Sequence, residues 1–392
     1  MRVIYLSPYP PARDGIGNYT CALANAVSEA GNDIAVIVPH GVLNAPAEVI
    51  GSAFRARSAA SDIRATVERW KPDIIHVQFA VAAFGGRSLL FLRWLKQFSR
   101  ASGIPVVVTL HEVTRETALL PILGSILFRR IARHCQHLIV HTDAALTTLT
   151  LRVGISQTMV TVIPHPTAEP PALESDPADL RARFALGDAR VLLAFGFIHV
   201  DKGLDDLVRA LSIIRRTDPA LLDGVRLVVA GAIRTRRGLF RVFEARDHLH
   251  LAHVLHLARR SGLQHTVVRT GYVPAGDVSA WFQLSDAAVL PYRRTEQSGV
   301  ASLARSFDIT ILASRVGGLA ELFSDSRWTF PPMAPALLAD TITTFLTEKR
   351  GEHCAPYLSS SPRADDLSSV TDSTLAVYRK VICGKAGRER FA

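Results

Sequence analysis

The residues best placed to do chemistry lie near the start of two consecutive helical patterns in the second half of the chain. Thr295-Glu296-Gln297-Ser298-Gly299 joins an apolar strand, Ala287 to Leu290, to a helix-like run from Val300 to Phe307. Gly317-Gly318 follows the next apolar run, Ile309 to Ala313, in the same way. A helix that starts at the carboxyl end of a buried strand presents unpaired N–H groups, which attract an anion. Two such starts in one crevice would suit a diphosphate.

The chain around this stretch alternates short apolar segments with helical patterns. It has 392 residues, of which 48% are hydrophobic, so two folded domains of ordinary size are expected. The alternation is typical of parallel sheets covered by helices on both faces, which are Rossmann-like, doubly wound α/β domains. The strand candidates are Val3 to Leu6, Ile34 to Val38, Asp73 to Phe79, Pro105 to Leu110, His137 to His141, Val160 to Ile163, Arg190 to Phe195, Val225 to Ala230, Val267 to Gly271, Ala287 to Leu290, Ile309 to Ala313 and Trp328 to Phe330.

A proline-rich segment separates two such series of strands. Pro164-His165-Pro166-Thr167-Ala168-Glu169-Pro170-Pro171 cannot continue a helix or a central strand, and an acidic, alanine-rich stretch follows it up to Asp188. We therefore predict a first domain over residues 1–170, a linker over 171–189, a second domain over 190–362 and a terminal helical segment over 363–392.

Glycines and polar side chains follow the strands expected in the first domain. Asp14-Gly15-Ile16-Gly17-Asn18-Tyr19 is a glycine loop between a strand and a helix, but Thr20 stands where the dinucleotide fingerprint needs its third glycine. The loop fits either a ligand contact or a tight turn into a packed helix. His76 and Gln78 lie near the end of one strand and His111-Glu112 just past the next, at the edge where such sheets bind ligands. His111 is the candidate for a reaction centre, and a structural hydrogen bond is the alternative.

A lysine stands at the first helix start of the second domain. Gly196-Phe197-Ile198-His199-Val200-Asp201-Lys202-Gly203 connects the strand Arg190 to Phe195 with an amphipathic helix, Leu204 to Arg215. An ammonium group at such a start is well placed to meet a phosphate, and a solvated lysine is the alternative. His199 would add positive charge only when its imidazole is protonated.

The charge of the chain calls for an anionic partner. The net charge is +10 and the pI is 9.8, which fits a nucleotide sugar, a phospholipid surface or nucleic acid. No helix-turn-helix, zinc-finger or aromatic RNA-binding motif is present, so nucleic acid is not expected as a partner.

An amphipathic segment offers one way to meet a membrane. From Arg87 to Arg100, Phe91, Trp94, Leu95 and Phe98 share one helical face and basic residues the other. Such a helix can lie on an anionic membrane, or its apolar face can pack on the sheet, which is the simpler interpretation. The apolar segment Ala118 to Ile131, with arginines near its end, has the same two interpretations. The basic run Arg234, Arg236, Arg237 and Arg241 is either a solvated helix start or a contact for an anionic acceptor or membrane.

Other features bound the compartment and the cofactors. No uninterrupted apolar run reaches the ~18 to 20 residues of a membrane span, and the N-terminus enters a strand directly with no signal-peptide pattern. We expect a cytoplasmic protein, with contact at the inner face of the cell membrane as a further expectation. The four cysteines, Cys21, Cys135, Cys354 and Cys383, form no C-x-x-C pair, so neither zinc nor a disulfide framework is expected.

The motifs of the second half resemble those of a known family, the retaining glycosyltransferases of family 4, which have the two-domain GT-B fold with a cleft between the domains. The resemblance covers nearly the whole chain. Its motifs are Leu290-Pro291-Tyr292, Glu296, Gln297-Ser298-Gly299, the strand end Ala313-Ser314 and Val316-Gly317-Gly318-Leu319-Ala320-Glu321. The chain departs from the commoner pattern in three places. Ala304 stands where a second Glu holds the nucleotide ribose, His199 where relatives usually have a phosphate-binding Arg, and Asp308 where they usually have Gly.

The resemblance also implies roles for individual residues. The implied catalytic residues are His111, which would face the donor sugar, and Glu296, which would bind sugar hydroxyls unless the adjoining Gln297 and Ser298 do so. The implied donor-binding residues are Gly15, Gly17, His199, Lys202, Gly271, Tyr272, Gln297, Ser298, Gly299, Val300 and Gly317. The implied acceptor-binding residues are Asn18, Tyr19, Gln78 and Glu112. The last helical pattern, Leu367 to Ile382, resembles the helix that crosses back to the first domain in the GT-B fold.

The expected function follows from the resemblance. The chain would move a sugar from a nucleotide diphosphate donor to a saccharide or lipid-linked acceptor with retention at the anomeric carbon, without a metal ion or cofactor, in polysaccharide or glycoconjugate biosynthesis. A paired-carboxylate hydrolase is less favoured because no two acids stand at defined strand ends of one domain. The alternative from another class is a catalytically silent GT-B protein that binds a nucleotide sugar or scaffolds a partner enzyme.

Overall fold

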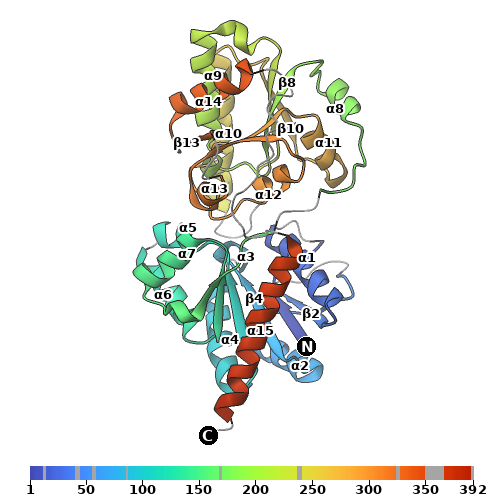
Figure 1. The fold of residues 1–392 in the computed structure, drawn as a ribbon, viewed down its shortest axis with the longest axis vertical. Coiled ribbons are helices and arrows are strands. Elements are labelled where there is room, and N and C mark those ends of the chain that lie inside the picture. Colours follow the sequence, from blue (N-terminus) through green and yellow to red (C-terminus); the bar gives the residue numbers. More distant parts are fainter. Residues whose placement is uncertain are drawn as a thin grey trace. The chain divides into compact units, whose positions relative to one another are not determined.

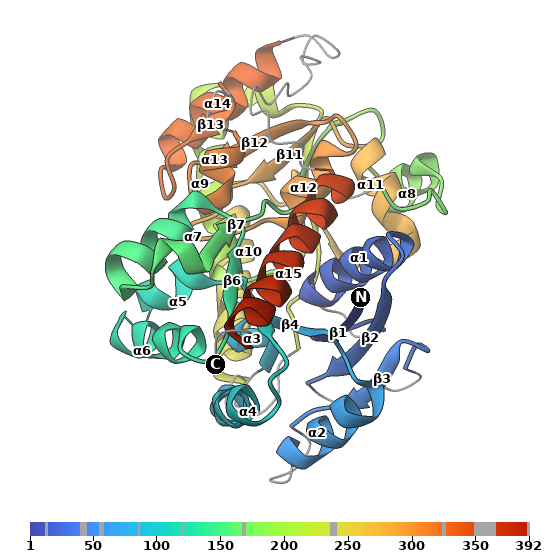
Figure 2. The ribbon, with the colours of Figure 1, turned by 60° about the horizontal axis from the view of Figure 1, so that its bottom comes forward.

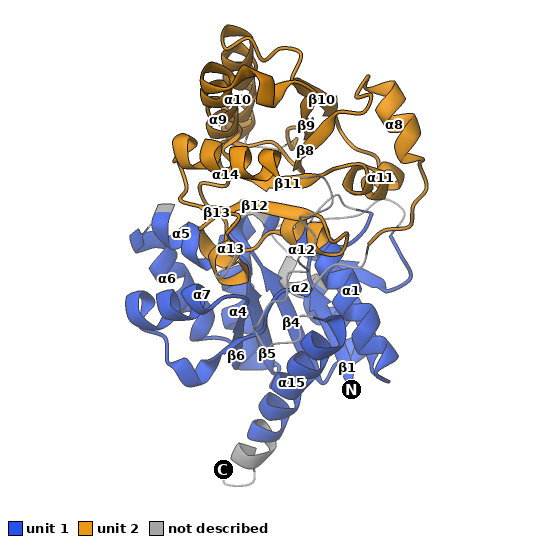
Figure 3. Ribbon diagram, turned by 45° about the horizontal axis from the view of Figure 1, so that its top comes forward, with its two compact units in different colours: residues 1–166, 363–392 blue, residues 167–362 orange. Residues whose placement is uncertain are grey.

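The chain forms two compact units, each built on one parallel sheet (Figure 1). The computed structural model describes residues 1–11, 15–39, 45–54, 59–84, 87–119, 121–166, 170–235, 241–323, 327–348 and 366–389. Unit 1 comprises Met1–Pro166 and Arg363–Ala392, and unit 2 comprises Thr167–Pro362 (Figure 3). Residues 171–189 include a helix, α8 (Pro177–Arg183), which belongs to unit 2. Two residues of the basic run, Arg236 and Arg237, lie outside the described residues.

The sheet of unit 1 has the strand order β3-β2-β1-β4-β5-β6-β7, with every neighbouring pair parallel. From β1 the chain adds β2 and β3 toward one edge of the sheet, and from β4, the neighbour of β1, it adds β5 to β7 toward the other edge. The sheet therefore has a topological switch point between these two strands, where open α/β sheets bind ligands. The strands are β1 (Arg2–Leu6), β2 (Asp33–Val38), β3 (Val49–Ser52), β4 (Ile74–Phe79), β5 (Val106–Leu110), β6 (His137–Val140) and β7 (Val160–Val162).

Helices cover both faces of this sheet because side chains alternate along each strand. Ile4 and Leu6 of β1 face a core shared with α2, α3, α4 and α6. Val3 and Tyr5 face a second core, shared with α1 and α15. These two helices lie alongside each other (Figure 2). The helices are α1 (Gly15–Glu29), α2 (Ala59–Trp70), α3 (Val81–Phe84), α4 (Ser88–Ala101), α5 (Val113–Leu119), α6 (Pro121–Ala132), α7 (Asp143–Thr147) and α15 (Leu367–Glu389), with a π-helical segment at Thr148–Val153 and a 3₁₀ turn at Gln157–Met159.

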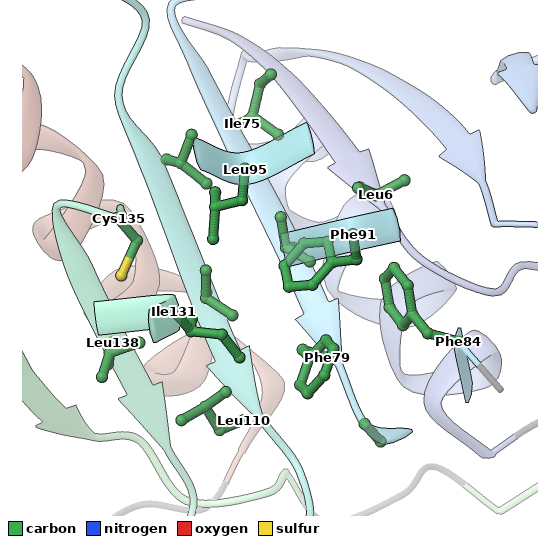
Figure 4. Packing of buried hydrophobic residues seen from close by; sticks show 14 of the residues in the cluster. Leu6, Ile75, Phe79, Phe84, Phe91, Leu95, Leu110, Ile131, Cys135 and Leu138 are labelled. Carbon is green, nitrogen blue, oxygen red and sulfur yellow. The ribbon is translucent and has the colours of Figure 1, made fainter. Parts of the chain in front are cut away.

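Helix α4 shows how the amphipathic pattern is used. Phe91, Trp94, Leu95 and Phe98 are all buried, and Figure 4 shows Phe91 and Leu95 among the side chains of the sheet. The apolar face of this helix therefore packs on the sheet, which is the simpler of the two interpretations of the pattern. Its basic face remains at the surface, together with Leu89 in the first turn, which is 66% exposed.

The sheet of unit 2 has the strand order β10-β9-β8-β11-β12-β13, again with parallel neighbours. Its switch point lies between β8 and β11, which pair through Ala287 with Leu192 and Ala288 with Leu193. The strands are β8 (Arg190–Phe195), β9 (Val225–Ala230), β10 (Val267–Gly271), β11 (Ala287–Leu290), β12 (Thr310–Ser314) and β13 (Thr329–Phe330).

Helices cover both faces of the second sheet as well. Helices α9, α10 and α14 pack on one face, and α8, α11, α12 and α13 pack on the other. Their bounds are α9 (Leu204–Thr217), α10 (Arg241–Arg260), α11 (Val278–Gln283), α12 (Gly299–Arg305), α13 (Gly317–Leu322) and α14 (Pro335–Thr347), with 3₁₀ turns at Val200–Lys202, Pro219–Leu222 and Ala275–Asp277. The prediction of two Rossmann-like, doubly wound domains is confirmed. No helix in the described part of the chain is both long enough and apolar enough to cross a membrane.

Candidate functional site

Two loops flank the switch point of unit 2. One follows β8 and carries Lys202, and the other follows β11 and carries Glu296. A small recess at this point is lined by residues of both loops, among them Gly196, Phe197, Lys202 and Tyr292. The two stretches that the sequence singled out separately therefore meet at the position where a doubly wound sheet binds its ligand.

Lys202 lies against the second of these loops. Its Nζ is 3.6 Å from the centroid of the Tyr292 ring, a cation–π contact. The next residue, Gly203, has a φ of +64°, and a Cβ at this position would overlap the carbonyl oxygen of Pro291. The glycine is thus needed for the backbone conformation and for the close approach of the two loops. Together these contacts place one ammonium group at the switch point.

The loop after β11 is also held on its other side. Ser314 Oγ, at the end of β12, donates a 2.6 Å hydrogen bond to the carbonyl of Tyr292, and the Gly318 N–H donates to the carbonyl of Glu296 at 3.0 Å. Gly317 has a φ of +47°, and a Cβ there would overlap the carbonyl of Thr295. The Gly317-Gly318 turn therefore packs on the β11 loop, and one of its N–H groups is already used within the protein.

The other donor-site candidates of unit 2 also lie at carboxyl ends of strands. Ser298 caps α12 by accepting a hydrogen bond from the Ala301 N–H at 3.1 Å. Val300 faces the β8 loop, since a Cβ on Gly196 would lie 3.2 Å from Val300 Cγ2. Gln297 is half-buried and Gly299 is exposed. Gly271 is the last residue of β10, the strand at one edge of the sheet. Tyr272 follows it and is 47% exposed.

Three further positions bear on the comparison with the family pattern. Glu296 is only 4% exposed. Ala304 is fully buried in the apolar cluster under α12, so no polar group stands at the place of the second Glu. The His199 side chain is 27% exposed, with Nδ1 3.9 Å from Asp201 Oδ2.

Unit 1 holds a cluster of neutral polar side chains instead of a charged loop. His111, after β5, places Nε2 2.8 Å from Gln78 Oε1 and Nδ1 3.3 Å from His141 Nε2. His141 in turn lies 2.9 Å from the carbonyl of Ile163, which accepts a hydrogen bond from Nδ1. The ring of Tyr19 stands edge-on to His111, with the centroids 5.5 Å apart. Both nitrogens of His111 thus contact protein groups, and Gln78 is directed toward His111 within the unit.

The cluster continues to the C-terminal helix. His76 Nε2 is 2.7 Å from Thr109 Oγ1 and 3.4 Å from the amide nitrogen of Gln78. His76 Nδ1 is 2.6 Å from the hydroxyl of Tyr378 in α15, and this hydroxyl donates to Tyr5 Oη at 3.2 Å. Polar groups of β1, β4, β5 and α15 are thus connected in one network with the loop residues His111 and His141.

Burial controls the ionisation of this cluster. It lowers the pKa of His76 to about 3 and that of His141 to about 3, and the neighbouring histidines add to the effect. Burial, followed by the charges of His141, His165 and His76, holds the pKa of His111 well below its usual value. Burial also raises the pKa of Tyr378 and Tyr5 above the usual tyrosine value. The network is therefore neutral at physiological pH.

The remaining candidates of unit 1 differ in accessibility. Tyr19 is 5% exposed and belongs to the histidine cluster through its ring, whereas Asn18 and Gly15 are exposed. Gly17 is buried, and a Cβ there would lie 3.3 Å from the backbone of Pro8. Glu112 Oε1 pairs with Arg115 Nη1 at 2.7 Å.

Sequence reasoning missed part of this network. His141 and His165 stand after β6 and β7 as His111 stands after β5, so the recurrence of histidines after successive strands was a usable signal. Tyr378 gave no such signal, because its contact with His76 joins residues 302 positions apart. Among the described residues, no group of three or more His, Cys, Asp or Glu side chains is arranged to hold a metal ion.

Two doubly wound parallel sheets, each with candidate ligand-binding residues at the carboxyl ends of its strands, are the architecture of the GT-B class of glycosyltransferases. The family model described as Glycosyltransferase Family 4 matches residues 13–167, and the model described as Glycosyl transferases group 1 matches residues 189–348. The two matches together span most of the chain. The chain belongs to the glycosyltransferases of the GT-B fold, and the first match agrees with family 4.

The chain is also similar to individual proteins. An alpha-D-kanosaminyltransferase of Streptomyces kanamyceticus is 26% identical over 306 residues, which are 72% of this chain and 72% of that protein. The crystal structure of an alpha,alpha-trehalose 6-phosphate synthase from Burkholderia multivorans has a TM-score of 0.74 at 18% identity, covering 99% of this chain and 98% of that one. The structure of Anabaena HepE in complex with UDP-glucose has a TM-score of 0.66 at 16% identity and full coverage of both chains. At these identities the two structures show the shared fold.

Proposed function

We propose that this glycosyltransferase moves a sugar from a nucleoside diphosphate sugar to a saccharide or lipid-linked acceptor, with retention at the anomeric carbon and without a metal ion. The reaction would serve polysaccharide or glycoconjugate biosynthesis. The observation that carries the proposal is the position of Lys202 at the switch point of unit 2, held against Tyr292 and next to Gly203. The complex of the structural neighbour HepE with UDP-glucose supports the choice of donor class.

The chemistry needs positive charge where the leaving group develops negative charge. When the bond between the sugar and the diphosphate breaks, the electron pair stays on the diphosphate oxygen. The ammonium group of Lys202 would stabilise this charge, and preoriented charges of this kind commonly contribute more to catalysis than any other effect. His199 and the backbone N–H groups at Gly299 and Gly317 would add to it, whereas Gly271 and Tyr272 would lie beside the nucleotide base.

The sugar and the acceptor would meet other groups. Glu296, or Gln297 and Ser298 beside it, would bind sugar hydroxyls. His111 would shape the reaction centre from unit 1 as a neutral ring, because burial holds its pKa well below the usual value. Among the acceptor candidates, Asn18 is exposed and Glu112 is partly exposed, so both are accessible to a saccharide.

A thermal-shift screen tests the donor assignment. The purified protein is melted with UDP, GDP, ADP and dTDP and with the corresponding nucleotide sugars, because a ligand that binds only the folded state raises the melting temperature. We expect one nucleotide series to stabilise the protein selectively. Absence of any shift would contradict the proposal. With the donor known, NMR of the product gives the anomeric configuration, and activity in EDTA tests the independence from metal ions.

The catalytically silent alternative keeps specific support. Ala304 is buried where a ribose-binding Glu is common, and Asp308 holds a positive φ of 52° where relatives usually have Gly. A silent protein would bind the nucleotide without turning over the sugar. Activity that is lost in a folded His111→Ala variant would exclude this alternative.

We also propose a peripheral membrane contact through α6 and the basic face of α4, at the inner face of the cell membrane. On α6, Ile122, Leu123 and Ile126 are exposed by 75%, 62% and 40%. The same face continues with Arg129, Arg130 and Arg133. Exposed apolar residues beside basic ones fit an anionic bilayer, in which the apolar groups are buried and the cations meet phosphates.

Vesicle binding tests this contact. The protein is sedimented with vesicles of phosphatidylglycerol and phosphatidylcholine, and a variant with serine at positions 122, 123 and 126 should lose most of the binding. Leu249→Ser removes an equally exposed leucine, 73% accessible, from α10 and serves as the control. Equal binding by the two variants would exclude α6 as the contact.

A further inference from the structure

Two adjacent carboxylates are buried at the start of α9, directly after the lysine loop. Asp205 and Asp206 are 5% and 4% exposed. Arg293, from the loop after β11, bonds to both of them: Nη2 lies 2.6 Å from Asp205 Oδ2, and Nε lies 2.8 Å from Asp206 Oδ2. The backbone N–H of Arg293 also donates to the carbonyl of Asp201 at 2.8 Å. Arg293 thus bonds to the lysine loop at one point and to the start of α9 at two.

The electrostatics of this cluster make the guanidinium hard to replace. Burial alone would raise the pKa of Asp205, but hydrogen bonding and charge from Arg293 outweigh it and the pKa is lowered. The two carboxylates likewise raise the pKa of Arg293, mainly through the hydrogen bond to Asp206. The planar fork of arginine can bond two carboxylates at once, and the single ammonium of lysine cannot reproduce that geometry.

The same carboxylates have other neighbours that do not join the two loops. Arg209 Nη1 lies 3.1 Å from Asp205 and 3.2 Å from Asp206, but its side chain is 45% exposed and it belongs to α9 itself. His250 of α10 places Nε2 3.7 Å from Asp205 Oδ1. Arg293, in contrast, contacts the two carboxylates from the loop after β11, the loop that also carries Glu296.

We propose that Arg293 is a positioning residue that sets the ammonium group of Lys202 for the donor diphosphate. Three residues separate Lys202 from Asp206, and Arg293 directly follows Tyr292, whose ring lies under the lysine ammonium. The guanidinium therefore fixes the lysine loop and its aromatic support to each other across the switch point. The inference rests on the proposed function, since it assigns Arg293 a role in binding the same donor.

Calorimetric titration of three variants tests the assignment. The probe is UDP, or whichever of GDP, ADP and dTDP stabilises the wild type in the thermal-shift screen. Arg293→Lys keeps the charge but loses the fork, and we expect the dissociation constant to rise about tenfold, which corresponds to about 1.4 kcal/mol. Arg209→Gln removes a cation from the same carboxylates and should change affinity less than about twofold. Asp206→Asn weakens one of the two bonds, because its amide oxygen can still accept a hydrogen bond but carries no charge, and its effect should fall between these values.

A double-mutant cycle separates positioning from general stability. In the Lys202→Ala background, Arg293→Lys should produce no further loss of affinity, because it acts through the lysine. In steady-state kinetics, Arg293→Lys alone should raise KM for the donor and leave KM for the acceptor unchanged.

Each outcome decides the question. Wild-type affinity in a folded Arg293→Lys protein, or additive losses in the cycle, would overturn the positioning role. If Arg293→Lys melts below the assay temperature, Asp206→Asn decides in the same cycle, and wild-type affinity of that variant would also overturn it. A wild-type protein that binds none of the four nucleotides would instead refute the proposed function.

Discussion

The two units use one architecture but hold their ionisable groups in opposite ways. Unit 1 places histidines at the carboxyl ends of its strands and keeps them neutral by burial. Unit 2 places charged groups around its switch point and pairs them, as Arg293 does with Asp205 and Asp206. A neutral network can fix a shape without attracting counter-ions, whereas a paired, charged one can present a cation to an anion. By this contrast, unit 1 is suited to fixing geometry and unit 2 to electrostatic stabilisation.

The largest expected effect comes from exchanging the main residue of each unit for alanine. Lys202→Ala should lower kcat by about 10²- to 10³-fold, the effect of removing one preoriented stabilising group, and should weaken nucleotide binding. His111→Ala should lower turnover while leaving nucleotide affinity near that of the wild type. Kinetics and calorimetry on both variants check this. Unchanged nucleotide affinity in Lys202→Ala would contradict the assignment of Lys202 to the donor diphosphate.

Acid should affect unit 1 before unit 2. The folded pKa of His76 and His141 lies near 3, below the value of about 6.5 for an unfolded histidine. Between these values the unfolded chain binds more protons, so the stability these histidines contribute is complete above pH 6.5 and falls as the pH is lowered toward 3. Each such histidine should cost about 1.4 kcal/mol per pH unit in this window.

Denaturant unfolding between pH 7.5 and 5 measures this dependence. In unit 2 the lowered pKa of Asp205 affects stability only below the ordinary range of an aspartate, whereas His250, whose pKa burial also lowers, acts in the same interval. Unit 2 should still change less, because unit 1 has His76, His111 and His141 in this state. A His76→Gln variant should show a shallower pH slope whatever its stability at pH 7.5. An unchanged slope would contradict the assignment to the histidine cluster.

Removing one hydroxyl should have a smaller effect on the network of unit 1. Tyr378→Phe leaves the ring in place but deletes the group that bonds to His76 and Tyr5. We expect a loss of about 1 to 2 kcal/mol in stability, because a buried imidazole nitrogen loses its partner. Tyr272→Phe changes a half-exposed tyrosine in unit 2 and should be silent in the same unfolding measurement. Equal stability of the two variants would show that the link to α15 is unimportant.

The smallest expected effect distinguishes capping from ligand binding in unit 2. Ser298→Ala should destabilise the protein by about 1 kcal/mol, since its hydroxyl accepts from the Ala301 N–H at the start of α12. If Ser298 only caps the helix, donor KM should stay the same at a temperature where the variant is folded. A raised donor KM would add sugar or phosphate binding to its role.

The sequence contained enough to predict the architecture of both units except for the short edge strand β3, which is half-buried and carries no apolar run that marks it. Strands such as Val106–Leu110 are uniformly buried, and nearly continuous apolar runs of that length are read directly from the chain. The amphipathic pattern of α4 identified its buried face but left open whether a sheet or a membrane covers it. Only the packed structure places Phe91 and Leu95 on the sheet.

The candidate site was predictable where it depends on local sequence. Lys202-Gly203 and Gly317-Gly318 are recognisable by residue type and spacing after strands. Arg293 was not, because its role depends on carboxylates 87 and 88 positions away that only the fold brings near. Gln78 was identified by its position near a strand end, but its direct contact with His111 depends on the register between β4 and β5.

Helix α15 has a consequence for the order in which the protein is made. Its residues follow all of unit 2 in the chain, yet Tyr378 and Val370 complete the core beneath Val3 and Tyr5. At about 5 to 20 residues per second, a ribosome needs roughly 10 to 40 s to add the second unit. For that interval one apolar face of the first sheet lacks part of its cover. Unit 1 thus emerges from the ribosome first but completes its core last. Longer loops in unit 2 would lengthen the interval before α15 is available to pack on the first sheet.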